Sequence, residues 1–291
     1  GCSKCSNSGN SKAEIEIIDF IKSFYSGKII YRYKPDFMNG RELDIYIPEF
    51  NFAIEFNGAY WHSEEKKGTN YHYDKWKICR DNGVTLLSIW DFYFNDSQKK
   101  QIYFSKIKHF MKMDEKVFAR KCTIKEVSNM EAIHFHKENH LEGIGILYKD
   151  SKSYGLFRGD ALIMIVTYGF FYNQGTKNSN LKVQRISTKM GVTVVGGVSR
   201  LISLIPKPFI FQVTLDTGGT ISNISDFENL TFRYWWVKSE KYLTRNRTQV
   251  SILKKNSDWK QDDTEKSYME RKGFIKICDA GIVTLKKYSQ V

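Results

Sequence analysis

Two short apolar segments that meet at a four-residue turn constrain the fold of this chain more than any other feature of its sequence. One segment, ELDIYIP, spans residues 42–48, and the other, NFAIEFNG, spans residues 51–58. Both are rich in β-branched and aromatic residues, which favour strands. The turn between them, Pro48-Glu49-Phe50-Asn51, is short enough to join antiparallel neighbours. The pattern therefore predicts a β-hairpin.

The flanking residues predict helices and further strands around this hairpin. Ser11 is a suitable N-cap, with Glu14 at the capping-box position, for a helix that begins AEIEIIDFIK. A strand, KIIYRYKP, precedes the hairpin, and a helix, YHYDKWKICRDN, follows it and ends at Gly83. A buried strand, VTLLSIWD, and a helix, SQKKQIYFSKIKHFMK, come next. We expect one α/β domain over residues 12–118, after a flexible Gly/Ser-rich tail at residues 1–11.

Residues 119–291 predict a second domain of mixed α+β type. CTIKEVS is expected to form a strand and NMEAIHFHKENH a helix. GIGILYKD and YGLFRGDALIMIVTYG are expected to form a meander, and LKVQRISTK is expected to form a strand before a helix, VSRLISLI. The remaining segments, FIFQVTLD, LTFRYWWVK and KICDAGIVTLKKY, favour strands.

Two carboxylates interrupt the apolar hairpin. Asp44 and Glu55 lie in adjacent strands, and burying a carboxylate is costly unless a cation accompanies it. Two such groups that meet across a hairpin can hold Mg²⁺, which activates water for phosphodiester hydrolysis. His62 has the chemistry of a general acid or base, and Glu14 could complete the site. Taken singly, each residue also has an ordinary explanation. Asp44 or Glu55 could lie at a sheet edge or pair with an arginine, Glu14 could cap a helix, and His62 could be a surface histidine.

Residues 11–94 resemble the very-short-patch repair endonucleases and the related phage homing endonucleases of the EDxHD type, a branch of the PD-(D/E)XK nucleases. The resemblance rests on Glu14 in the first helix, LDIYIP with Asp44, the Asn57-Gly58 pair, the Trp61-His62 pair, and Asn82-Gly83 before LLSIWD.

This resemblance implies a metal-dependent DNA endonuclease. Asp44 would be the principal ligand of Mg²⁺ or Mn²⁺, with Glu55 nearby, His62 as the proton-transferring residue and Glu14 as a supporting acid. His72 falls where the family has a further polar active-site residue, and the alternative at that position is Asp74. The repair enzymes have a histidine where this chain has Asn57, which is also where the superfamily's usual lysine stands. This departure favours the homing-type relatives.

The net charge suits double-stranded DNA as a partner. The chain carries 45 basic and 32 acidic residues, a formal charge of +13. Residues 1–120 hold 19 basic and 16 acidic residues (+3), which leaves 26 and 16 (+10) for residues 121–291. We expect the second domain to supply much of the affinity for a polyanion.

One stretch of the second domain alternates basic and aromatic residues. Basic groups bind phosphates, and aromatic rings can stack on bases. A basic strand and turn on a surface that does not bind DNA would show the same sequence pattern. The predicted DNA-binding residues are Arg233, Trp235, Trp236, Lys238, Lys241, Arg245 and Arg247.

The second domain also resembles, loosely, the GNAT acyltransferases. The segment LKVQRISTKMGVTVVGGVSRLISLI, with Gly191, Gly196 and Gly197, is similar to the strand, glycine loop and helix of that superfamily.

The sequence leaves two alternatives to an active nuclease. The chain could be a DNA-targeted GNAT-like acyltransferase, or a DNA-binding protein with an inactive nuclease site. The presence of both Asp44 and Glu55 disfavours the second alternative.

The cysteines and the remaining histidines do not by themselves indicate a further metal or catalytic site. Cys2 and Cys5 have the spacing of half a zinc site, so Zn²⁺ would need further ligands outside this sequence. The histidines of HFHKENH favour surface or core roles. Five cysteines without a framework of spacings, no apolar run of membrane-spanning length and no apolar leader predict a reduced, cytoplasmic protein without a membrane partner.

Overall fold

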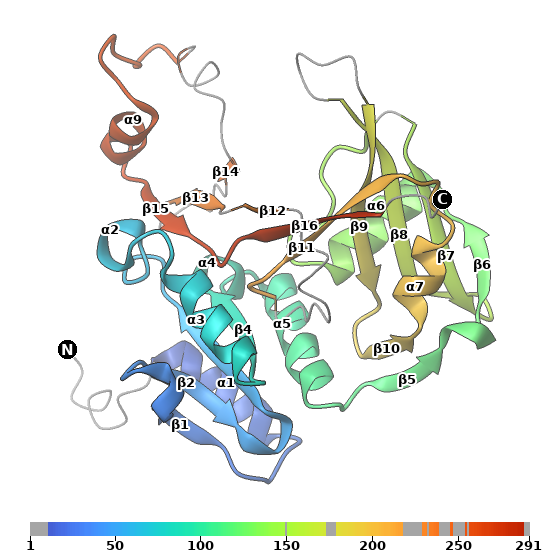
Figure 1. Ribbon diagram of the computed structural model, residues 1–291, viewed down its shortest axis with the longest axis horizontal. Coiled ribbons are helices and arrows are strands. Elements are labelled where there is room, and N and C mark those ends of the chain that lie inside the picture. Colours follow the sequence, from blue (N-terminus) through green and yellow to red (C-terminus); the bar gives the residue numbers. More distant parts are fainter. Residues whose placement is uncertain are drawn as a thin grey trace. The chain divides into compact units, whose positions relative to one another are not determined.

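The computed structural model is mixed α/β, as the sequence predicts (Figure 1). It describes residues 11–148, 150–172, 179–217, 229–231, 233–238, 245–246, 254 and 256–287. The chain packs into two compact units. Unit 1 comprises residues 1–95, 214–220 and 231–282, and unit 2 comprises residues 96–213, 221–230 and 283–291.

Unit 1 contains a four-stranded sheet in the order β1-β2-β3-β4. The predicted hairpin is confirmed, because β2 pairs with β3 in antiparallel register, with Ile45 opposite Ile54. Asn51 makes the turn with a φ of 44°, in the left-handed region that asparagine tolerates better than most residues. β4 then pairs with β3 in parallel. The strands are β1 (Ile30–Tyr33), β2 (Leu43–Ile47), β3 (Phe52–Asn57) and β4 (Thr85–Trp90).

Two helix-boundary signals of the sequence are confirmed in unit 1, although α1 ends at Lys22 rather than at Gly27. Ser11 caps α1 by accepting a hydrogen bond from the backbone N–H of Glu14. Gly83, with a φ of 72°, follows the helix that connects β3 to β4. The helices are α1 (Lys12–Lys22), α2 (Glu64–Lys67), α3 (Tyr71–Asp81), α4 (Asp91–Phe94) and α9 (Glu265–Arg271), with 3-10 turns η1 (Asp36–Met38) and η2 (Pro48–Phe50).

A second sheet of unit 1 is built from residues far along the chain. It has the order β14-β13-β15, with β13 (Tyr234–Val237) between β14 (Arg245–Asn246) and β15 (Ile275–Cys278). Trp236 of β13 is buried against Tyr268 and Met269 of α9. The sequence places residues 231–282 in the second domain, whereas they pack within the unit that contains residues 1–95.

Unit 2 is organised by a seven-stranded sheet in the order β12-β16-β11-β9-β8-β7-β6 (Figure 1). Helices cover both faces of its centre. Leu156 packs with Leu201 of α7, and the next residue of β7, Phe157, packs with Phe135 of α6. Consecutive strand residues point to opposite faces, so α6 and α7 lie on opposite sides of the sheet.

The elements of unit 2 include a parallel two-stranded ribbon, β5 with β10.

Two elements of unit 2 differ from the prediction. The helix at residues 97–110, expected in the first domain, packs in unit 2. The strand expected at residues 143–150 is absent from the described part of that segment, where Ile146 is 93% exposed. The helices are α5 (Ser97–Phe110), η3 (Ala119–Lys121), α6 (Asn129–Asn139) and α7 (Gly197–Ile202). The strands are β5 (Glu115–Phe118), β6 (Thr123–Glu126), β7 (Lys152–Arg158), β8 (Ala161–Tyr172), β9 (Ser179–Thr188), β10 (Val192–Val195), β11 (Phe209–Thr214), β12 (Asn229–Thr231) and β16 (Ile282–Lys287).

His136 of α6 is a structural residue, as expected for this histidine-containing helix. Its side chain is fully buried, and its two ring nitrogens bond the hydroxyls of Ser187 and Thr167 at 2.7 and 2.8 Å. Burial lowers the pKa of His136 to about 3, with a smaller contribution from Arg185. The folded state therefore holds a neutral imidazole.

This burial predicts that unit 2 loses stability in acid. A histidine whose pKa is depressed by folding contributes its full stability above the unfolded pKa of about 6.5, and the contribution is lost as the pH falls toward 3. Between pH 7 and pH 4.5 we expect His136 to account for a loss of roughly 3 kcal/mol. Hydrogen exchange of β8 and β9 amides, corrected for intrinsic rates, would measure it. His136→Gln should flatten this dependence, whereas His134→Gln, at an exposed position, should keep it. Equal slopes in all three proteins would contradict the assignment.

Within the described residues, no helix combines the length and apolar character needed to cross a membrane.

Candidate active site

Asp44 and Glu55 lie next to each other across β2 and β3, as the sequence predicts. The register that pairs Ile45 with Ile54 places the two carboxylates on neighbouring strands. Asp44 Oδ2 accepts a hydrogen bond of 2.8 Å from the backbone N–H of Phe56. Asp44 is half-buried and Glu55 is buried. The hairpin therefore holds two acidic groups in a largely dry setting.

Lys75 is a third charged member of this cluster, and sequence reasoning missed it. It lies on α3, is 2% exposed, and its ammonium forms an ion pair with Glu55 Oε1. Burial opposes the charged amine, but the negative charges around it, with Glu55 the strongest, outweigh that cost and raise the pKa of Lys75. A signal was present in the sequence. Lys75 shares the buried stripe of α3 with His72 and Cys79, at spacings of three and four residues.

Among the described residues, Asp44 forms no ion pair, and Lys75 acts on it only as a nearby charge. Burial, together with the negative charge of Glu55, raises the pKa of Asp44 to about 7. Glu14, half-buried in the first turn of α1, adds to this effect and is therefore close enough to act on Asp44. The three acids carry more negative charge than Lys75 neutralises, so a further cation would be favoured here.

His62 and His72 form the next part of the site. Their ring centroids lie 5.2 Å apart, and the His72 ring lies 4.9 Å from that of Trp90. Burial lowers the pKa of His62 to about 4, helped by the charges of Lys67 and Lys75. Burial also lowers the pKa of His72 to about 3. Both imidazoles are therefore neutral at pH 7.

Unsatisfied polar atoms gather at these residues. In the described part of the chain, eight buried side-chain nitrogen or oxygen atoms have no hydrogen-bond partner. Five of the eight are Glu55 Oε2, both polar atoms of Asn57, His62 Nδ1 and His72 Nε2. Buried polar groups are nearly always paired in folded proteins, so such a concentration indicates a place for a ligand, ion or water.

The donor set fits a hard divalent cation. Glu55 Oε2 is an orphaned carboxylate oxygen beside Asp44, and oxygen ligands of this kind suit Mg²⁺ or Mn²⁺. Among the described residues, no group of three or more His, Cys, Asp or Glu side chains is arranged to hold a metal by itself. Mg²⁺ does not need one, because it is commonly held by one or two carboxylates and fills its other positions with water and substrate phosphate.

Three residues predicted to bind DNA lie in the interior of unit 1. Trp236 is 1% exposed, and its indole N–H donates to Glu265. Arg233 and Trp235 are also buried, and both donate to Asp279 Oδ2. A buried guanidinium paired in this way cannot reach a phosphate without leaving its partner. These three side chains belong to the core rather than to the DNA-binding surface expected from the sequence.

The remaining predicted DNA contacts are placed only in part. Lys238 is half-buried, with its ammonium 5.8 Å from the centre of the Phe274 ring. Lys241, Arg247 and the side chain of Arg245 lie outside the described residues, as do Cys2 and Cys5 of the predicted half zinc site. The other three cysteines, Cys79, Cys122 and Cys278, are buried free thiols.

The segment that resembles GNAT does form a strand, loop and helix. β9 is followed by β10 and then by the short helix α7. Gly191 and Gly196 have φ values of 76° and 75°, which glycine adopts readily. Gly197 is buried, and a Cβ there would meet Met164 Sδ at 2.5 Å. The glycines thus have packing and turn roles, and the resemblance to GNAT stays a prediction.

Comparison of the chain with protein-family models and with curated proteins finds no match.

Proposed function

We propose that this protein is a metal-dependent endonuclease that hydrolyses phosphodiester bonds in double-stranded DNA. The observation that carries the proposal is the cluster of Asp44, Glu55 and Lys75, with neutral His62 and His72 beside it and unpaired polar atoms at its centre. Two neighbouring carboxylates can bind a divalent cation, and a bound cation can activate water for phosphodiester hydrolysis. A homing-type, site-specific enzyme is the form of this activity that the sequence resemblance favours.

The residues have separate roles in this proposal. Bound Mg²⁺ would polarise the scissile phosphate and lower the pKa of a water molecule. Asp44 and Glu55 Oε2 would hold the cation, while the charge of Lys75 favours the ionised form of Glu55 and fixes its orientation. His62, with an unpartnered Nδ1, accepts the proton of the attacking water. His72 packs against His62 and limits its orientations.

Lys75 can also supply the positive charge that a lysine at residue 57 would provide. In the wider PD-(D/E)XK superfamily, the usual lysine stands two residues after the second acid, where Asn57 is found. Here α3 brings Lys75 to Glu55 from another part of the chain. The absence of a lysine at residue 57 is therefore no argument against catalysis, since the same charge is available from a different element.

The proposal is tested by cleavage of supercoiled plasmid and of phage genomic DNA. We expect cutting with Mg²⁺ or Mn²⁺ and none with EDTA, since the paired carboxylates cannot activate water without a cation. Protein treated with EDTA should recover activity when Mg²⁺ is restored. Equal cutting with and without metal would contradict the proposed mechanism.

Two exposed aromatic side chains near the site predict a DNA contact. Tyr60 and Trp61, which directly precede His62, are 57% and 66% exposed, and Lys66 lies over both rings at 4.3 and 4.8 Å. Large exposed rings beside a cation suit stacking on bases next to a phosphate. Trp61→Ala should weaken DNA binding about tenfold in filter-binding or anisotropy assays.

Tyr31→Ala is the matched control for this prediction. Tyr31 is 39% exposed and lies opposite Ile45 on the edge strand β1, which carries none of the proposed site residues. DNA affinity should be unchanged in this variant. Equal losses of affinity in the Trp61 and Tyr31 variants would mean that stacking at Trp61 contributes nothing specific.

A further inference from the structure

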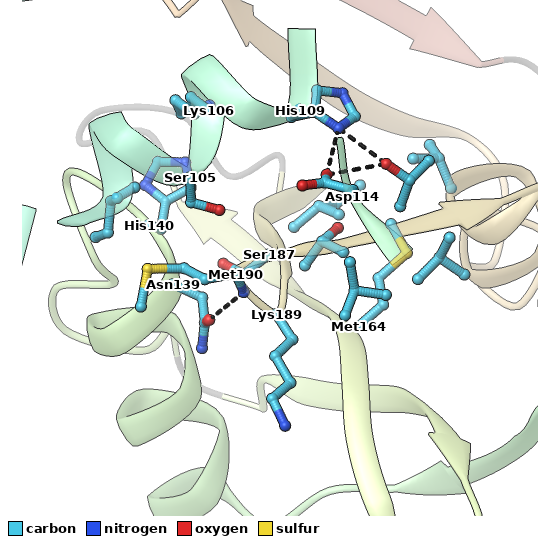
Figure 2. Close-up of a pocket in the computed structure, with 17 residues that line it drawn as sticks. Ser105, Lys106, His109, Asp114, Asn139, His140, Met164, Ser187, Lys189 and Met190 are labelled. Atoms are coloured by element: carbon cyan, nitrogen blue, oxygen red, sulfur yellow. Dashed lines mark hydrogen bonds and ion pairs between the residues drawn. The ribbon is translucent and has the colours of Figure 1, made fainter. Parts of the chain in front are cut away.

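Unit 2 contains a pocket that the proposed nuclease chemistry does not use. Its volume is about 370 Å³, which lies in the range of small-molecule sites. α5, the end of α6, β9 and β10 supply most of its wall, and every lining residue falls between residues 102 and 198 (Figure 2). The pocket therefore belongs to a single compact unit.

Lys106 of α5 carries a positive charge into this pocket without an anionic partner. Its side chain is half-buried, and no hydrogen bond or ion pair joins it to any described residue. Burial alone lowers the pKa of Lys106 to about 8. An ammonium group in this position is destabilised by burial and would be stabilised by a bound anion.

Asp114 is the only carboxylate among the described residues that line the pocket, and one of its two oxygens is unused. Oδ2 bonds His109 Nδ1 at 2.9 Å and the hydroxyl of Thr193 at 3.0 Å (Figure 2). Oδ1 is buried and has no hydrogen-bond partner, although the side chain is only 4% exposed. A buried acceptor of this kind is costly unless a donor reaches it. The pocket thus presents an acceptor as well as a cation.

The rest of the lining favours an organic anion over a simple ion. Lys106 and Lys189 contribute two positive charges against the one negative charge of Asp114, so these three formal charges sum to +1. Ile102, Met164 and Val194 add apolar wall. A ligand that fits has an acidic group for Lys106, a donor for Asp114 and a less polar body between them.

We infer that this pocket binds a small phosphate monoester whose body carries hydroxyl or N–H donors, of the size of a mononucleotide. A phosphate offers nearly two negative charges and several acceptor oxygens at pH 7, which suits Lys106 together with the neighbouring His109 and His140. Asp114 Oδ1 accepts from the body of the ligand. The inference does not depend on the proposed nuclease activity.

NMR titration of the full chain with AMP, inorganic phosphate and phenyl phosphate tests this inference. We expect saturable shifts of amides in residues 102–109, 139–140 and 186–194 with AMP, at a Kd of about 1 mM or below. Adenosine, which lacks the phosphate, should bind at least about tenfold more weakly, because the charge-assisted contact to Lys106 is lost. A short DNA duplex distinguishes a backbone phosphate as the source, since it would then displace AMP from the same residues.

Variants locate the binding. Lys106→Met keeps the length of the side chain and removes its charge, so AMP affinity should fall at least about tenfold. Lys116→Met is the matched control, because Lys116 is exposed on β5 and does not line the pocket. If Lys106→Met disturbs folding, Lys106→Arg should restore both the fold and phosphate binding. The inference is overturned by the absence of saturable shifts with all three phosphates at about 10 mM, by equal affinity for adenosine and AMP, or by displacement of AMP by the duplex.

Discussion

Asp44→Asn is expected to abolish DNA cutting while leaving DNA binding nearly intact. The substitution keeps the shape of the side chain but removes the charge that would hold the cation beside Glu55. Loss of a cation that stabilises a transition state by several kcal/mol corresponds to a fall in rate of about 10³-fold or more. Plasmid cleavage in Mg²⁺ measures the rate, and anisotropy in Ca²⁺ measures DNA affinity.

The same variant should be more stable than the wild-type protein at pH 8. Burial and the charge of Glu55 raise the pKa of Asp44 to about 7. Because this pKa is raised on folding, the ionised carboxylate reduces the free energy of unfolding as the pH rises toward and through 7, and asparagine carries no such charge. Urea unfolding monitored by tryptophan fluorescence suits this measurement, since all six tryptophans lie in unit 1.

Asp19→Asn is the control for both measurements. Asp19 is exposed on α1 and takes no part in the cluster. This variant should cut DNA at the wild-type rate and unfold at the wild-type urea concentration. Cutting by Asp44→Asn at a rate near that of Asp19→Asn would remove Asp44 from the catalytic site.

Lys75→Met is expected to lower the stability of unit 1 strongly. The substitution leaves Glu55 as a buried carboxylate without its counter-ion. Removing one partner of a buried ion pair costs about 3–5 kcal/mol, because the remaining charge is left uncompensated. Urea unfolding should show this loss. Lys77→Met, at an exposed position one half-turn along the same helix, should show little change.

A double variant separates the structural role of Lys75 from its role in cutting. Lys75→Met with Glu55→Gln removes both charges, so most of the lost stability should return. Cutting should nevertheless stay at least about 10²-fold below wild type, because Glu55 and Lys75 are both required at the site. A stable double variant that cuts at the wild-type rate would show that the pair is only a structural ion pair.

Much of unit 1 could be predicted from local patterns. The short connection at residues 48–51 predicts the hairpin, and the register that results is set by apolar residues at alternate positions of β2. Ser11 predicts the start of α1. Asp44 and Glu55 stand out because acids are rare in apolar strands. These signals depend on neighbours within a few residues, which is why sequence alone is sufficient for them.

The predicted DNA-binding stretch shows where local patterns mislead. Alternating basic and aromatic residues at 233–236 look the same whether the strand is exposed or buried. The outcome depends on Asp279 and Glu265, which lie more than 25 residues away and accept the polar hydrogens of Arg233, Trp235 and Trp236. The predicted domain boundary misses residues 231–282 for the same reason, because their packing with residues 1–95 is a long-range property.

The sequence by itself determined the α/β class, the hairpin and the two carboxylates that meet on it, since each follows from short-range periodicity and from the cost of burying charge. Only the tertiary structure decided that Lys75 pairs with Glu55, that burial keeps His62 and His72 neutral, and that a pocket forms around Lys106 and Asp114. The physical reason is that desolvation and ion pairing depend on which side chains surround a group in space, and elements distant in the chain supply most of those neighbours.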